Sequence, residues 1–284
     1  MALRSRGAAW PFALIVTAAG LVGCAGAAPA PADIAVAVYQ PRTDVAAERI
    51  AITIENLRSE PLEITGARLE SPGFAEHMTW PGERTATVQP GRAVDLRVPL
   101  VPPDCAADPP VTGTVVLTYR QGADDVDARL PLPAGDDRLP ALWRQGCLAS
   151  RVAEVATIGS ADFLWTPGVP EAVLVVDIVP TGREGTVRLL EAAGTTLLSP
   201  AQEGRAVPRA PLDIAVSASD PPSSLRVPMV PNRCDAHALA EDKVGTRIPL
   251  LVETEDGSTG RLVLAASDAL RERMYGFFVD ACAL

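Results

Sequence analysis

A ten-residue stretch occurs twice in this chain and constrains its fold more than any other feature. Residues 96–105 read LRVPLVPPDC and residues 225–234 read LRVPMVPNRC, so seven of ten positions are identical. Two strand-like runs joined by a turn follow each copy, then a helix-like run, and then a second cysteine, which is Cys147 or Cys282. We therefore expect one domain plan used twice, over residues 33–150 and 151–284.

Short alternating runs fill the first half. Ile50, Ile52 and Ile54 alternate with smaller or polar residues, which is typical of a half-buried strand. Similar runs cover residues 34–39, 62–69, 85–88 and 94–101, and residues 111–120 and 126–132 form a predicted hairpin. About seven short strands at this spacing predict an antiparallel sandwich of immunoglobulin-like type. Residues 136–143 begin with Asp136 and Asp137 and predict a short helix that brings Cys147 to Cys105.

The second half repeats this order. Strands are predicted at 172–179, 186–190, 212–216 and 225–230, and a hairpin over 248–253 and 261–265 turns at Asp256 and Gly257. Residues 267–278 place Leu270, Met274 and Phe277 at helical spacing. The predicted fold is mostly β: two tandem immunoglobulin-like antiparallel β-sandwiches, each ending in a short disulfide-tethered helix. No long linker separates them, so we expect a restricted relative orientation.

The amino end has the features of an export signal. Arg4 and Arg6 precede an apolar run from about residue 8 to residue 21, and small residues follow it. A basic segment, an apolar segment and small residues in this order are typical of a secretory signal peptide, here residues 1–23. A membrane-spanning helix needs about 20 apolar residues, and this shorter run also contains Pro11. A retained transmembrane helix is therefore the less favoured interpretation.

The residues Leu21-Val22-Gly23-Cys24 resemble a bacterial lipobox. The resemblance implies that the Cys24 thiol carries a diacylglyceride and becomes the mature amino terminus. The alternative is an ordinary signal peptide that contains a cysteine. Residues 24–32 would then be the lipidated cysteine and an alanine- and proline-rich tether of about 25 Å. This predicts an exported lipoprotein, held by its acyl anchor at the outer face of the cell membrane; the composition is typical of a GC-rich genome such as an actinobacterial one.

Five cysteines leave one unpaired, and lipidation of Cys24 accounts for it. Exported proteins favour disulfides, and four cysteines allow three pairings. The repeat selects Cys105 with Cys147 and Cys234 with Cys282, at separations of 42 (147 − 105) and 48 (282 − 234) residues. In the chain-entropy model, closing each loop stabilises the fold by roughly 4 kcal/mol. A tetrathiolate metal site is the alternative, but the close Cys-x-x-Cys pairs of such sites are missing.

The charge of the chain limits its partners. The formal net charge is −10, and removal of residues 1–23 takes away Arg4 and Arg6, which gives −12 for the mature chain (−10 − 2). An acidic chain gains nothing from polyanions, so we expect no nucleic acid partner. Anionic headgroups would also repel it, which leaves the acyl anchor to hold it at the bilayer.

Residues 76–80 form the loop that most resembles a functional site. His77 and Met78 supply an imidazole and a thioether, which are ligands suited to copper. A site needs further ligands, however, and no second histidine–methionine cluster exists. The alternative interpretation is an exposed polar loop with Trp80 facing the core. His237, the other histidine, is interpreted as a surface loop residue.

Two acidic hairpin tips are candidates for calcium. One contains Asp124, Asp125 and Asp127, and the other contains Glu253, Glu255 and Asp256. Neither tip matches the calcium-loop pattern, and hairpin ends are commonly charged and solvated. The preferred interpretation is therefore a solvated turn in both cases.

The sequence predicts no enzyme and no cofactor. It contains no Gly-x-Ser-x-Gly nucleophile elbow and no Walker or dinucleotide glycine loop. The preferred hypothesis is a non-catalytic envelope lipoprotein that presents loops or a strand edge to a protein or cell-wall partner. The alternative is copper binding or handoff at His77 and Met78. A third possibility, an enzyme of unfamiliar type, requires a deep polar pocket between the repeats.

Overall fold

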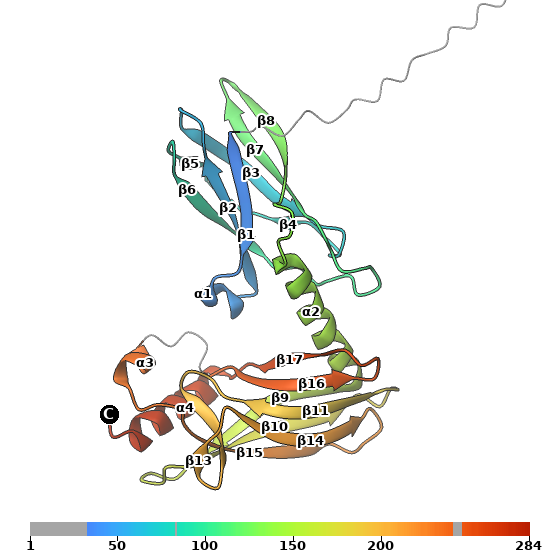
Figure 1. Ribbon diagram of the computed structural model, residues 1–284, viewed down its shortest axis with the longest axis vertical. Helices are drawn as coiled ribbons and strands as arrows, with labels where there is room; N and C mark the ends of the chain where they lie inside the picture. The colour runs from blue at the N-terminus through green and yellow to red at the C-terminus, as the bar shows by residue number, and fades with distance from the viewer. Residues whose placement is uncertain (1–32, 83, 241–245) are drawn as a thin grey trace, which may run out of the picture.

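The fold is predominantly β. A computed structural model describes residues 33–82, 84–240 and 246–284, and every strand pairing within them is antiparallel. Four sheets form two sandwich-type units that lie one above the other in Figure 1, with a helix between them. The first unit comprises β1 to β8 and the second comprises β9 to β17. At this level the predicted fold class is confirmed.

The first unit packs two sheets around an aliphatic core. One sheet has the order β1-β2-β6, and the other has the order β4-β3-β7-β8, with β5 also paired to β3. Ile50, Ile52 and Ile54 of β2 are at most 1% exposed, which confirms the alternation in the sequence. The elements are β1 (Ile34–Tyr39), α1 (Arg42–Val45), β2 (Arg49–Asn56), β3 (Leu62–Glu70), β4 (Met78–Thr79), β5 (Ala86–Val88), β6 (Ala93–Pro99), β7 (Thr114–Gln121) and β8 (Asp124–Pro131).

The second unit repeats the strand pairing of the first. The order β9-β10-β15 corresponds to β1-β2-β6, and β14-β11-β16-β17 corresponds to β5-β3-β7-β8, while β12 and β13 extend the former sheet beyond β15. The elements are β9 (Ala156–Leu164), β10 (Ala172–Pro180), β11 (Thr186–Ala193), β12 (Leu198–Gln202), β13 (Arg205–Ala206), β14 (Arg209–Ser217), β15 (Ser223–Pro231), α3 (Ala236–Ala240), β16 (Ile248–Thr254), β17 (Thr259–Leu264) and α4 (Asp268–Ala281).

The repeated stretch occupies the same place in both units. Its first copy enters β6, where Val98 lies opposite Ile50, and its second copy enters β15, where Val227 lies opposite Leu174. All four side chains are at most 1% exposed. The identical residues therefore specify equivalent core positions, after which each copy leads to a cysteine.

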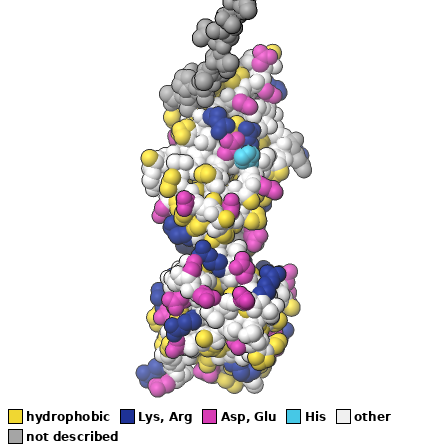
Figure 2. Space-filling view, turned by 90° about the vertical axis from the view of Figure 1, so that its right-hand side faces the viewer, with side chains coloured by type: hydrophobic (Ala, Val, Ile, Leu, Met, Phe, Trp, Pro, Cys, Tyr) yellow, Lys and Arg dark blue, Asp and Glu magenta, His cyan; other side chains and the backbone are white. Residues whose placement is uncertain are grey.

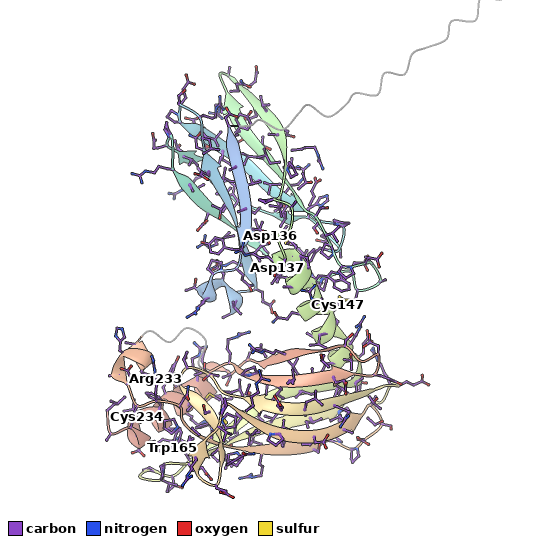
Figure 3. The ribbon with its side chains drawn as sticks, viewed as in Figure 1. Asp136, Asp137, Cys147, Trp165, Arg233 and Cys234 are labelled. Atoms are coloured by element: carbon purple, nitrogen blue, oxygen red, sulfur yellow. A yellow bond between two sulfur atoms is a disulfide. The ribbon has the colours of Figure 1, made fainter. Side chains whose placement is uncertain are left out.

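Each unit contains one disulfide. Cys105 is bonded to Cys147 with their Cα atoms 5.5 Å apart, and Cys234 is bonded to Cys282 with their Cα atoms 5.1 Å apart. These are the two pairs that the repeat predicts. Figure 3 shows Cys147 on the helix between the units and Cys234 on the second unit. Such bonds indicate an oxidising, exported environment.

The helix that contains Cys147 is much longer than expected. Helix α2 spans Arg138–Val155, whereas the sequence predicted a helix over residues 136–143 only. Pro140 lies in the first turn, where its missing N–H costs no hydrogen bond, and the helix continues through Gly146. Asp137 is the N-cap residue but makes no capping hydrogen bond with its side chain. Because α2 runs through residue 150, the domain boundary at that residue stays a prediction.

Candidate functional site

The junction between the two units is the most distinctive part of the molecule. Helix α2 contributes Leu139, Trp143 and Cys147 to the core of the first unit, at four-residue spacing. Its second half contributes Leu148, Val152 and Val155 to the core of the second unit. An α-helix of 18 residues is about 27 Å long. One continuous helix is therefore built into both hydrophobic cores.

The first half of α2 packs closely on the segment after β6. The indole Nε1 of Trp143 donates a hydrogen bond of 3.0 Å to the carbonyl of Asp104, and Cys147 is bonded to Cys105 nearby. Gly146 permits this approach, because a Cβ atom at that position would lie 2.8 Å from Cγ of Pro103. A glycine at position 146 thus allows α2 to pack closely on this segment.

The second half of α2 is attached to the last hairpin of the second unit. Arg151 lies 2.7 Å from a carboxylate oxygen of Asp256 and donates a hydrogen bond of 2.9 Å to the hydroxyl of Ser258. Asp256 also accepts hydrogen bonds from the Thr254 hydroxyl and the Ser258 amide. These hydrogen bonds, with the nearby Arg151 charge, lower the pKa of Asp256 to about 2.

Segment α1 brings a buried charge toward the junction. Figure 1 shows α1 at the end of the first unit that faces the second. The side chain of Asp44 is only 3% exposed, and it lies 2.9 Å from Arg49 and 2.5 Å from Arg97. A buried carboxylate requires such paired charges. The two arginines on β2 and β6 therefore hold α1 against the sheet.

A second carboxylate continues this polar face. Asp95 accepts hydrogen bonds from the hydroxyls of Tyr39, at 2.5 Å, and Thr53, at 2.8 Å. Burial acts to raise the pKa of Asp95, but these hydrogen bonds and the charge of Arg97 outweigh it and hold the pKa below its ordinary value. The hydrogen bond to Asp95 and burial raise the pKa of the Tyr39 hydroxyl. The outer face of β1-β2-β6 thus carries a connected polar network.

A cavity of about 260 Å³ lies between the units. The α1 segment lines it from the first unit, and the residues just before β16, the residues just before α4 and helix α4 itself line it from the second. Its described lining residues are Thr43, Ala46, Thr246, Arg247, Ala266, Arg271 and Tyr275. This lining contains two arginines and no carboxylate, so the cavity is suited to an anionic group.

The predicted copper ligands do not converge. Met78 is 1% exposed within the first core, whereas His77 is exposed and lines a surface cavity of about 400 Å³. His77 lies just before β4, whereas Met78 is its first residue, so the imidazole is at the surface and the thioether is in the core. Trp80 packs against the core, as predicted. Copper binding therefore stays a prediction that no contact of these two side chains favours.

An ion pair lines the cavity beside His77. Glu70 lies 2.6 Å from Arg129 and 2.9 Å from Arg68. The hydrogen bond from Arg129, with a weaker contribution from Arg68, lowers the pKa of Glu70 despite its partial burial. Figure 2 shows a histidine on the first unit with charged side chains of both signs around it. Because the carboxylate is already paired, it is a poor ligand for a cation.

The acidic hairpin tips are held by neighbouring side chains. Asp127 accepts a hydrogen bond from Thr118, and Asp125 lies 3.8 Å from Arg120, while Asp124 is exposed. In the second unit Glu253 lies 3.7 Å from Arg188, and Glu255 is exposed.

His237 is exposed in α3. Across residues 33–82, 84–240 and 246–284, no three His, Cys, Asp or Glu side chains form a group that could hold a metal ion.

The predicted lipidation residue, Cys24, lies outside the described residues, as do the predicted signal peptide (residues 1–23) and the predicted tether (residues 24–32). In the part of the chain that the structure describes, no helix is both long enough and apolar enough to cross a membrane.

Sequence reasoning missed the paired network at Asp44 and Asp95, because only the strand register brings Thr53 opposite Asp95. It also missed Arg247 and Arg271, which no motif distinguishes from other arginines.

No protein-family model matches this chain, and no curated protein matches it. Among solved structures, it is similar to a red sea bream transglutaminase, at 12% identity and a TM-score of 0.23, over 83% of this chain and 32% of that one. The chain thus spans about a third of that transglutaminase. It is also similar to the chaperone YadV, at 14% identity and a TM-score of 0.20, over 82% of this chain and 100% of that one. The Pseudomonas aeruginosa chaperone CupB2 gives 11% identity, a TM-score of 0.20, and coverage of 78% and 95%. Similarities this low carry no argument about function.

Proposed function

We propose that this protein is a non-catalytic envelope lipoprotein that acts as a rigid two-unit binding module for a protein or cell-wall partner. The observation that carries the proposal is the placement of α2 in both hydrophobic cores. A helix fixed at both ends supports a constant orientation of the two units. Such a body can present a surface at a defined distance and angle from its anchor.

The strand pairing supports a finer description of each unit. A sheet of the first, second and sixth strands faces a sheet built on the third, seventh and eighth, which is compatible with an immunoglobulin-like sandwich. On this proposal the two units are tandem immunoglobulin-like domains, and α2 closes the first and enters the second. Loops at the ends of such sandwiches commonly bind partners.

The resemblance of residues 21–24 to a bacterial lipobox supports an acyl anchor at the amino end. Strand β1 begins at the end of the first unit that lies away from the second unit (Figure 1). An anchor joined there through a tether of about eight residues would hold the first unit near the bilayer. The second unit would then project from the membrane and would be the part most accessible to a partner.

Mass spectrometry of the membrane fraction tests the anchor. We expect a diacylglyceryl adduct on Cys24, and we expect Cys24→Ser to lose both the adduct and membrane retention. An unmodified Cys24 in a membrane-free protein would contradict the proposal.

Site-specific photocrosslinking in the native envelope tests the binding module. A photoreactive residue at exposed Val169 of the second unit should capture a defined partner, whereas one at exposed Leu57 of the first unit should capture less of it. Equal capture from both positions, or none from either, would contradict the proposed orientation.

A further inference from the structure

Arg247 is the exception among the partly buried arginines of this protein. Five arginines of the described residues are partly buried. Four of them lie near a carboxylate: Arg58 at 3.4 Å, Arg68 at 2.9 Å, Arg97 at 2.5 Å and Arg151 at 2.7 Å. Arg247 has no ion pair with any described residue, and its Nε atom is buried without a hydrogen-bond partner. A partly desolvated guanidinium favours a negatively charged partner.

The position of Arg247 indicates where a negatively charged partner would lie. The side chain lines the cavity of about 260 Å³ between the units. Arg271 lines the same cavity, but it already lies 2.6 Å from Asp268. The cavity therefore has one positive charge that no described carboxylate compensates.

We propose that this cavity binds a small monocarboxylate, with its carboxylate against the guanidinium of Arg247. One uncompensated positive charge matches one negative charge, and the chain as a whole carries a formal charge of −10, which opposes dianions and polyanions. The planar guanidinium fork also matches a carboxylate in two parallel hydrogen bonds.

The rest of the lining limits the body of the ligand. Ala46, Ala266 and Tyr275 offer a small apolar wall, and Thr43 and Thr246 offer hydroxyl groups. The volume lies below the range of about 300–1,000 Å³ that is typical of sites for drug-sized ligands. A short aliphatic body with one or two polar groups fits these limits.

The cavity is composite, because Thr43 and Ala46 belong to the first unit and both arginines belong to the second. A bound ligand would touch both units and reinforce the orientation that α2 sets. The site does not depend on the lipid anchor or on a macromolecular partner. Loss of carboxylate binding would therefore leave the proposed function standing. Absence of the anchor or of partner capture would likewise leave the carboxylate site standing.

Ligand-observed NMR titration of the full chain in detergent tests the site. The probes are acetate, propionate and N-acetylalanine, each compared with its neutral amide, and inorganic phosphate. We expect at least one carboxylate to bind, its amide to bind at least about tenfold more weakly, and phosphate to bind more weakly than the carboxylate. No binding by any carboxylate, equal binding by the amide, or tighter binding of phosphate would overturn the proposal.

Two variants place the binding in the cavity. Arg247→Gln should weaken carboxylate binding at least about tenfold, whereas Arg261→Gln, which changes an exposed arginine on β17, should leave it within twofold. Thr43→Trp should also weaken binding by filling the cavity from the first unit without altering either arginine. Unchanged affinity in both Arg247→Gln and Thr43→Trp would overturn the assignment, and unfolding curves of each variant check that it folds.

Discussion

Helices α2 and α4 hold the same place in their units, yet they end differently. Each follows the last hairpin of its unit and brings a cysteine back to the cysteine that ends the repeated stretch. Helix α4 ends at Ala281, and Cys282 is its C-cap. Cys147, in contrast, lies within α2, which continues for eight more residues (155 − 147) to Val155. Those eight residues contain the side chains that enter the second core.

The longer helix explains how two units of one plan are joined into a fixed pair. The closing helix of a single unit needs only one apolar stripe, as Leu270, Met274 and Phe277 provide in α4. A second stripe on the same helix attaches the next unit with no loop between them. The orientation of the pair is then set by the continuity of one helix, and the Arg151–Asp256 ion pair adds a contact at its end.

Alanine substitutions in the two halves of α2 should lower the free energy of unfolding most, each in a different unit. Trp143→Ala should destabilise the first unit by about 3–5 kcal/mol, because it leaves a large cavity in that core. Leu148→Ala should destabilise the second unit by about 2–5 kcal/mol. Residue-resolved hydrogen exchange should show lost protection in β2 and β7 for the former and in β10 and β16 for the latter. Loss of protection in the same unit for both variants would contradict the dual role of α2.

A smaller effect compares glycines in the two helices. Gly146→Ala should cost about 1–3 kcal/mol, because its Cβ would lie 2.8 Å from the ring of Pro103. Gly276→Ala in α4 should be neutral or stabilise by up to about 1 kcal/mol, because its Cβ would meet only Trp165, at 3.6 Å. Urea unfolding of both variants measures the difference. Equal free energies of unfolding would show that α2 does not pack closely on the segment around Pro103.

The smallest effect concerns the pH dependence of the contact between α2 and the last hairpin. The pKa of Asp256 is lowered from 3.8 to about 2, so its stabilising contribution is present above about pH 4 and is lost as the pH falls through 2. The Thr254 hydroxyl is the largest cause and the Arg151 charge is a minor one. NMR titration of the Asp256 carboxyl should therefore show a larger rise in pKa for Thr254→Val than for Arg151→Ala. The reverse order would mean that the ion pair to α2, and not the turn, dominates.

Much of the fold follows from the sequence, because alternation and helical spacing are local signals. The strand around Ile50, Ile52 and Ile54 and helix α4 lie close to their predicted bounds. Strand β9 was missed because only Ala156 and Phe163 of its nine residues are buried, so it shows no alternation. The second half of α2 was missed because its apolar residues serve a different core, and their stripe is offset from that of Trp143 and Cys147.

Far less of the candidate site follows from the sequence. Thr43 and Arg247 line one cavity but lie 204 residues apart (247 − 43), and only the packing of two units brings them together. The network at Asp95 depends on the register of β2 against β6. His77 and Met78, the pair that sequence chemistry selects, are separated because one is exposed and the other lies in the core.

A distance distribution between two spin labels, one in each unit, measures whether α2 holds the two units in one orientation. Genetically encoded labels at exposed Arg92 and Arg226 leave both disulfides intact. We predict a single narrow distance for the wild-type chain and for Ser150→Ala. We predict a broad distribution for Ser150→Pro, because proline within a helix costs about 3 kcal/mol or more and interrupts it. A broad distribution in the wild-type chain would contradict the account.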